Sequence, residues 1–140
     1  MQNDMVKKLD IWSEKTMAAE KNFENKVKRF LKSQGAYIIK YWGGAVYTKK
    51  GVPDLLVCIN GWFLGIELKA PKGKPSDLQL YNLRKIEQAG GIGFVLYPKH
   101  YDDFVKFIEH LKLGEQPVNL YDVYPFLTEW NDIKLLRKDD

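Results

Sequence analysis

Three charged residues, Asp54, Glu67 and Lys69, lie at the ends of two apolar segments within residues 51–70, GVPDLLVCINGWFLGIELKA. Charged side chains are seldom placed in buried strands unless another group compensates them. Two carboxylates and an ammonium are groups that can hold a hard divalent cation and stabilise negative charge on a phosphate. The residue types therefore predict a metal-assisted site that hydrolyses phosphodiesters.

The two apolar segments flank Asn60-Gly61, which is a strong signal for a two-residue hairpin turn. Counting outward from this turn places Asp54 directly opposite Glu67, with the Cβ atoms about 4.5–5.5 Å apart. Two facing carboxylates repel one another unless a cation or a proton intervenes. Alternation along the second strand puts Lys69 on the same face, and Gly65 is expected to leave room beside the three charges.

The hard carboxylate oxygens of the cluster suit Mg²⁺, with Mn²⁺ as a substitute, rather than zinc, because no histidine or cysteine is near them. A divalent ion can hold a phosphate and lower the pKa of a bound water, and Lys69 could orient that water. The alternative interpretation is a Lys–Glu pair on a solvated sheet face, with Asp54 merely ending a turn. Spacing alone leaves both interpretations open.

Hydrophobic periodicity predicts the elements that would position the cluster. Helices are expected over 18–34, 76–89 and 102–112, and strands over 36–42, 54–59, 62–69 and 92–97. This order predicts an α/β fold with a central mixed sheet flanked by helices. A single domain is expected, with its core over 18–112. An N-terminal extension over 1–17 either continues the first helix or lies apart. A C-terminal extension over 113–140 is expected to contain a short helix around 126–136.

Composition limits the classes of protein that fit. The formal charge of +4 and the pI of about 9.0 are compatible with nucleic-acid binding but do not require it. Neither a membrane span nor a signal peptide is expected, since no apolar run is long enough and the N-terminus lacks an apolar region. Cys58 is the single cysteine, which excludes a disulfide framework, favours a reducing cytoplasm and predicts a small buried side chain.

The same stretch resembles the signature of PD-(D/E)XK nucleases, with Pro53-Asp54 as its first half and Glu67-Leu68-Lys69 as its second, 13 residues further on. Residues 20–98 are most similar to VRR-NUC domains and to archaeal-type Holliday junction resolvases, including small versions found in phages and prophages. The two halves together, after one helix and before another, are more specific than either half alone. The resemblance implies a restriction-endonuclease-like core with the order α-β-β-β-α-β.

The resemblance also implies a role for each residue of the signature. Asp54 and Glu67 would be metal ligands, and the backbone carbonyl of Leu68 would complete the inner coordination shell. Lys69 would be the catalytic lysine.

Two further residues enter through the resemblance. The family often carries a glutamate on the first helix, for which Glu20 and Glu24 are candidates, and the spacing before Gly35 favours Glu24. The alternative for Glu24 is a solvated helix glutamate. Gln79 matches a glutamine that VRR-NUC-like members place near the site, but it is also the last residue of a capping box that begins at Ser76. Both roles are possible for Gln79 if its side chain changes partners.

Two basic loops bracket the cluster and predict where nucleic acid would lie, because phosphates must be drawn to an acidic pocket. The expected contact residues are Lys40, Trp42, Lys49 and Lys50 before the cluster, and Lys72 and Lys74 after it. A Gly-Gly pair in the first loop would let an aromatic side chain wedge at a distorted base step. The alternative is a pair of ordinary solvated loops with turn glycines.

These observations and the resemblance together predict a Mg²⁺-dependent endonuclease acting on DNA in the cytoplasm of a bacterium or a phage-infected cell. By resemblance, the substrate would be branched, such as a Holliday junction or a flap, and the enzyme would be a homodimer. One alternative is a non-catalytic nucleic-acid-binding module with the same fold. Another is a nuclease subunit of a larger phage or restriction complex.

Overall fold

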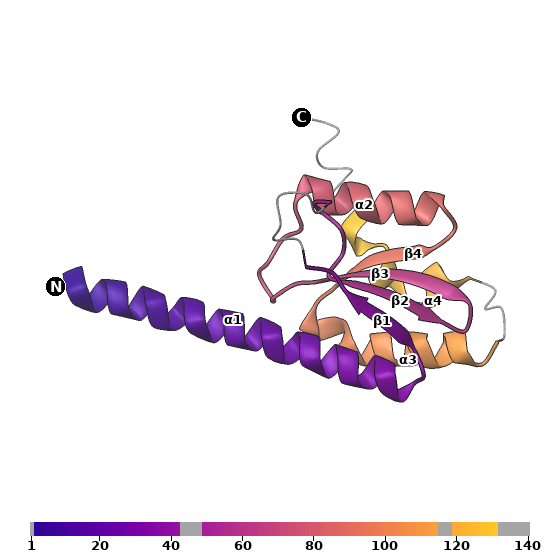
Figure 1. The fold of residues 1–140 in the computed structure, drawn as a ribbon, viewed down its shortest axis with the longest axis horizontal. Coiled ribbons are helices and arrows are strands. Elements are labelled where there is room, and N and C mark those ends of the chain that lie inside the picture. Colours follow the sequence, from indigo (N-terminus) through magenta and orange to yellow (C-terminus); the bar gives the residue numbers. More distant parts are fainter. Residues whose placement is uncertain (1, 43–48, 115–118, 132–140) are drawn as a thin grey trace.

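The computed structural model describes residues 2–42, 49–114 and 119–131. The strands in these ranges are β1 (Tyr37–Lys40), β2 (Leu55–Ile59), β3 (Trp62–Leu68) and β4 (Ile92–Leu96), and the helices are α1 (Gln2–Ser33), α2 (Asp77–Gln88), α3 (Tyr101–Lys112) and α4 (Leu120–Val123), with 3₁₀ turns at Pro98–His100 and Pro125–Leu127. The strand order is β1-β2-β3-β4, antiparallel except for the parallel pair β3–β4. The predicted α/β fold with a mixed sheet flanked by helices is confirmed (Figure 1).

The β2–β3 hairpin has the register that its turn predicts, with Leu55 paired with Ile66. Asn60 and Gly61 have φ angles of 48° and 83°, which is the left-handed geometry that a two-residue turn requires. Asp54 directly precedes β2 and therefore lies across from the end of β3. The turn thus sets the pairing on which the candidate site depends.

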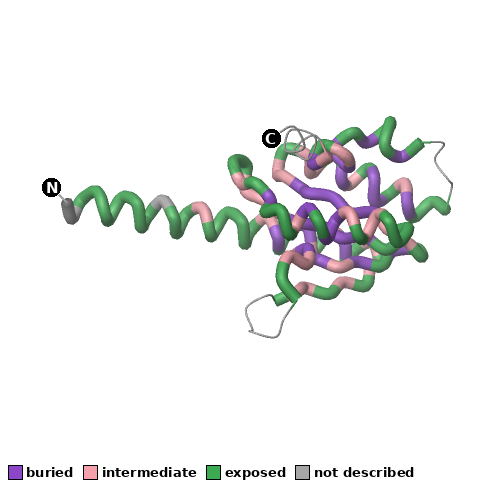
Figure 2. The backbone as a smooth tube through the Cα atoms, turned by 90° about the horizontal axis from the view of Figure 1, so that it is seen from above, coloured by how far each residue is buried: buried purple, intermediate pink, exposed green. Residues whose placement is uncertain are grey.

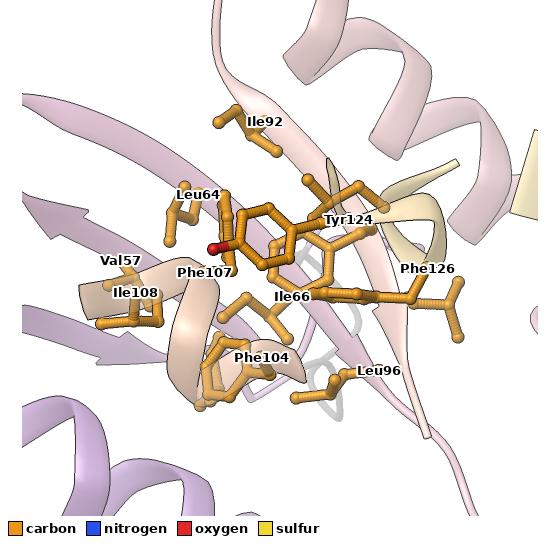
Figure 3. Packing of buried hydrophobic residues seen from close by; sticks show 14 of the residues in the cluster. Val57, Leu64, Ile66, Ile92, Leu96, Phe104, Phe107, Ile108, Tyr124 and Phe126 are labelled. Carbon is orange, nitrogen blue, oxygen red and sulfur yellow. The ribbon is translucent and has the colours of Figure 1, made fainter. Parts of the chain in front are cut away.

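The core lies mainly on the face of the sheet toward α3, where aromatic rings from β4, α3 and the C-terminal segment pack together (Figure 3). The C-terminal segment contributes Leu120, Tyr124, Phe126, Leu127 and Trp130 to this core. The Trp130 indole donates to the carbonyl of Gly93 on β4 at 3.0 Å. Residues 120–130 therefore cap the core. Of the helix expected around 126–136, residues 125–127 form a 3₁₀ turn, 129–131 are helical, and the remainder lies outside the described ranges.

Helix α1 is longer than the periodic pattern indicated, because residues 2–17 continue it without a break. Its C-terminal part packs on the sheet through Val27 and Leu31, whereas its N-terminal part projects from the body of the molecule with Met5 and Leu9 exposed (Figures 1 and 2). Even so, none of the helices in the described ranges is both long and apolar enough to cross a membrane.

Cys58 is exposed, so the prediction that it is a small buried side chain is wrong. It pairs across the sheet with Tyr37 on β1 and Phe63 on β3, whose side chains are also exposed. Helix α2 packs on β3 and β4. A strand is buried on both faces only where a layer of structure covers each face of the sheet. At Cys58 only one face of the sheet is covered, so its side chain is exposed on the other.

Candidate active site

The three charged residues of the hairpin meet at the end of β3. The Asp54 carboxylate accepts a hydrogen bond from the Leu68 backbone N–H at 2.9 Å, which ties it across to β3. Lys69 Nζ lies 3.5 Å from Glu67 Oε1, and the Glu67 side chain is only 2% exposed. The alternative of a Lys–Glu pair on a solvated sheet face is therefore wrong for Glu67, which lies under α2.

The buried position of Glu67 determines its electrostatics. Burial and the negative charge of Asp54 raise the pKa of the Glu67 carboxyl to about 8, although the positive charge of Lys69 opposes this shift. One of its oxygens, Oε2, is buried without a hydrogen-bond partner. A buried carboxylate oxygen with no donor is destabilising unless a cation or a proton reaches it.

Gln79 makes the capping-box bonds and a contact with Glu67 at the same time. Its Oε1 accepts from the Ser76 backbone N–H at 2.8 Å while the Ser76 hydroxyl accepts from the Gln79 backbone, which completes the capping box of α2. Its Nε2 donates to Glu67 Oε1 at 3.0 Å. No change of partners is needed, because the two ends of the amide face different neighbours. The capping box therefore holds the amide in place beside Glu67.

Gln79→Glu should separate these two roles, since glutamate can accept from the Ser76 backbone but cannot donate to Glu67. We expect Gln79→Glu to lower the free energy of unfolding by about 1–3 kcal/mol at pH 7, because Glu67 Oε1 loses its amide donor. The loss should shrink at pH 4, where the introduced carboxyl becomes protonated and can donate in place of the amide. Ser76→Ala is the control, with a loss of about 1 kcal/mol at both pH values. Urea unfolding at pH 7 and pH 4 measures the free energy of unfolding of the wild type and both variants. Equal losses for Gln79→Glu at both pH values would contradict the contact with Glu67.

Gly65 does not leave the room for a ligand that the sequence suggested. A Cβ at this position would lie 2.3 Å from Ile86 Cδ1 of α2. Gly93, its partner on β4, approaches the backbone of Leu83 in the same way, with a Cβ-to-carbonyl distance of 2.8 Å. The two glycines therefore allow α2 to pack closely on the sheet, and this packing buries Glu67.

Glu24 lies on α1 near the cluster and is 8% exposed, so it is not a solvated helix glutamate. Lys40 donates a hydrogen bond to it, and Lys28 Nζ lies 3.5 Å from its Oε2. Burial alone would raise the pKa of the Glu24 carboxyl, but the hydrogen bond and the positive charges of Lys40, Lys28 and Lys21 outweigh burial and lower it. Glu24 is therefore an anion held by lysines.

Lys40 joins Glu24 to the hairpin cluster, since its Nζ also lies 3.8 Å from Asp54 Oδ1. A pocket of about 270 Å³ opens at this point between α1 and the ends of the strands. Its lining includes Glu20, Glu24, Lys40, Trp42, Asp54 and Leu68. The bridge formed by Lys40 was not predicted from the sequence.

The remaining residues expected to contact nucleic acid are exposed around this cluster. Trp42 is 70% exposed, and Lys40 Nζ lies 5.4 Å from the centre of its ring. Lys49 and Lys50 on one side, and Lys72 and Lys74 on the other, are all exposed. The Gly-Gly pair expected to act as a hinge falls in 43–48, outside the described ranges. Lys40 differs from the others because it faces carboxylates.

The residues at the end of β3 fit a divalent cation in their donor chemistry, since two carboxylates supply hard oxygen ligands. The unpartnered Oε2 of Glu67 is the atom that such a cation would satisfy. In the described part of the chain, however, no group of three or more His, Cys, Asp or Glu side chains is arranged to hold a metal. The ligands available in this arrangement are Asp54 and Glu67, because Glu24 is engaged by lysines.

Comparison of this chain with known proteins found no matching family model, no matching curated protein and no matching solved structure.

Proposed function

We propose that this protein is a metal-dependent endonuclease that hydrolyses phosphodiester bonds in DNA. The observation that carries the proposal is the buried Glu67 carboxyl beside Asp54. Its Oε1 lies 3.5 Å from Lys69 Nζ, and its Oε2 has no hydrogen-bond partner. A proton compensates this oxygen while the carboxyl is neutral, and a bound cation would take the place of that proton. Strongly perturbed carboxyls are typical of functional sites.

Asp54 and Glu67 would hold the metal, and the resemblance adds the backbone carbonyl of Leu68. When bound, a divalent cation would neutralise charge on a phosphate and lower the pKa of a coordinated water. The hydrogen bond from the Leu68 N–H orients Asp54, and the one from Gln79 orients Glu67. These two bonds keep the carboxylates in position before a substrate arrives.

Lys69 supplies the positive charge of the site. Its side chain is 19% exposed, so its ammonium is partly shielded from water while it can still reach a ligand. In this position it would stabilise the charge that develops on the phosphate, or orient the attacking water. The exposed lysines on both sides, Lys49-Lys50 and Lys72 with Lys74, would contact neighbouring phosphates.

We further propose a restriction-endonuclease-like core of the VRR-NUC or resolvase type, and the strand order and the position of the cluster on the hairpin support this proposal. That resemblance makes branched DNA the expected substrate and a homodimer the expected assembly, since a symmetric enzyme can cut two symmetric strands.

A second candidate is a non-catalytic nucleic-acid-binding module, and the state of Glu24 favours it. The acid that the resemblance assigns to the metal is instead neutralised by Lys40 and Lys28. A module that only binds DNA would have no use for a free third acid. The two candidates differ in whether any DNA is cut.

The test is a cleavage panel of labelled linear duplex, single strand, flap and four-way junction with Mg²⁺, Mn²⁺ or EDTA. We expect metal-dependent cutting, and a loss of about 10²–10³-fold in rate for Asp54→Asn and for Lys69→Met. Lys106→Met on the exposed face of α3 is the charge-matched control and should cut like the wild type.

Each result separates the candidates. Cutting that is lost in Asp54→Asn and Lys69→Met but kept in Lys106→Met supports the nuclease. DNA binding that survives Asp54→Asn, with no cutting by any variant or metal, supports the binding module. A nuclease that works only within a larger complex would cut after a partner is added, and its size would increase in the mixture.

A further inference from the structure

A second cavity, of about 470 Å³, lies beside the candidate site and holds none of the residues assigned to the cleavage step. It is formed by the loop after β3, the end of β4 and the C-terminal segment. We call it the β4 pocket, and its lining consists of Pro71, Lys72, Gly73, Lys74, Val95, Tyr97, Lys99, Glu129 and Trp130. Its volume is in the range of small-ligand sites, about 300–1,000 Å³.

The lining of the β4 pocket combines positive charge with apolar and aromatic side chains. Lys72, Lys74 and Lys99 are exposed ammoniums. The single carboxylate, Glu129, faces His100, with 3.3 Å between Oε2 and Nε2. The excess of positive charge selects an anion.

The walls of the pocket are fixed in place by hydrogen bonds. Val95 and Trp130 are 3% and 2% exposed, and the Trp130 indole is anchored to Gly93 on β4. The Tyr97 hydroxyl donates to the Gly73 carbonyl at 2.8 Å, which ties the lysine-bearing loop to the strand. Tyr97 is the half-buried aromatic of this lining. An accessible aromatic side chain beside ammoniums suits a ligand with a planar apolar part and an anionic part, which describes a nucleotide.

The β4 pocket is next to the carboxylate cluster. Val95 pairs with Glu67 in the parallel β3–β4 register, so the two side chains share a face of the sheet, on strands about 4.8 Å apart. The Lys69 backbone N–H donates to the Leu96 carbonyl at 3.1 Å, and Lys69 therefore lies between the two sites. A strand with its phosphate at Glu67 would bring an adjacent nucleotide to the pocket.

We propose that the β4 pocket binds an unpaired nucleotide of the nucleic-acid strand, with its phosphate on Lys72, Lys74 and Lys99 and its base against the aromatic side chain. A base in a duplex is stacked and paired, and removing it from the stack is unfavourable by a few kcal/mol. The pocket therefore favours single-stranded or branched DNA over linear duplex. This inference rests on the proposed function only for cleavage of the bound DNA strand at the neighbouring carboxylate cluster, since binding in the pocket needs no cleavage.

The test measures binding by fluorescence anisotropy in EDTA, with a labelled oligothymidylate and the matching duplex at one fixed salt concentration. Lys99→Glu should weaken oligothymidylate binding by about tenfold, because a charge-assisted contact is replaced by repulsion. Lys106→Glu on α3, an exposed lysine outside the pocket, is the matched control and should change both affinities by no more than about twofold. Lys74→Glu is a second variant in the loop and should behave like Lys99→Glu.

Three outcomes would overturn the proposal. Lys99→Glu and Lys106→Glu could weaken oligothymidylate binding equally, or Lys99→Glu could weaken duplex binding as much as single-strand binding. Displacement of the oligothymidylate by a similar concentration of dTMP would show a site for free nucleotides instead. The proposed function can fail separately: if no DNA is cut but Lys99→Glu still weakens single-strand binding selectively, the pocket stands and the nuclease does not.

Discussion

Glu67→Gln should make the protein in EDTA more stable than the wild type at pH 9, and it should abolish metal-dependent cleavage. The pKa of the Glu67 carboxyl is about 8 in the folded protein, against 4.5 as its ordinary value. The folded state therefore binds this proton more tightly than the unfolded state. A substitution that stabilises the protein but abolishes its activity marks a residue that is retained for function at a cost in stability.

The direction of the pH dependence follows from the raised pKa. Below pH 4.5 the carboxyl is protonated in both states, and its full contribution to stability is present. Between pH 4.5 and about 8 the unfolded state ionises first, so stability falls as the pH rises. One pKa unit corresponds to about 1.36 kcal/mol, so the total loss is on the order of 5 kcal/mol. Glutamine is neutral throughout, and its amide can place a donor where Glu67 Oε2 lacks a partner.

Urea unfolding in EDTA at pH 5 and pH 9 measures the difference between variant and wild type. The stability of Glu67→Gln relative to the wild type should be greater at pH 9 than at pH 5 by on the order of 4 kcal/mol. Glu14→Gln, at an exposed position of α1, should show no such change. At pH 8, Mn²⁺ should raise the midpoint of thermal unfolding of the wild type and leave that of Glu67→Gln unchanged. A difference between Glu67→Gln and wild type that is the same at both pH values would show that Glu67 is not an abnormal acid.

The hairpin could be read from the sequence because its information is local. Asn60-Gly61 sets a turn, the turn sets the register, and alternation then places Asp54, Glu67 and Lys69 together. The order of the elements followed from periodicity for the same reason.

What the sequence did not predict depends on contacts between distant segments. Cys58 is exposed because α2 covers only part of one sheet face, and a strand pattern does not contain that fact. Gly65 serves the packing of α2 against the sheet, which needs Ile86 to be placed first. The dual role of Gln79 needed the position of β3 relative to α2. Each of these features appears only when one layer is placed on another.

Lys40→Met should increase the affinity of the protein for Mn²⁺ by about tenfold. Lys40 donates to Glu24, and its Nζ lies 3.8 Å from Asp54, so a cationic side chain already neutralises the acids around the pocket between α1 and the strands. Removing this charge makes the pocket more negative. Two unit charges 4 Å apart interact by about 4 kcal/mol at an effective dielectric constant of 20, and partial exposure of Lys40 reduces the benefit.

Isothermal titration of the EDTA-stripped protein with Mn²⁺ at pH 7.5 measures this affinity without any need for cleavage. Lys28→Met is the matched control, because Lys28 Nζ lies 3.5 Å from Glu24 Oε2, whereas Lys40 donates to Oε1. It removes the same charge from Glu24 but leaves Lys40 bridging Glu24 and Asp54, so its effect should be clearly smaller. Equal or weaker Mn²⁺ binding by Lys40→Met would mean that Lys40 does not compete with the cation. A larger gain for Lys40→Met than for Lys28→Met would identify Lys40 as an internal counter-ion, displaced when Glu24 and Asp54 turn to a metal.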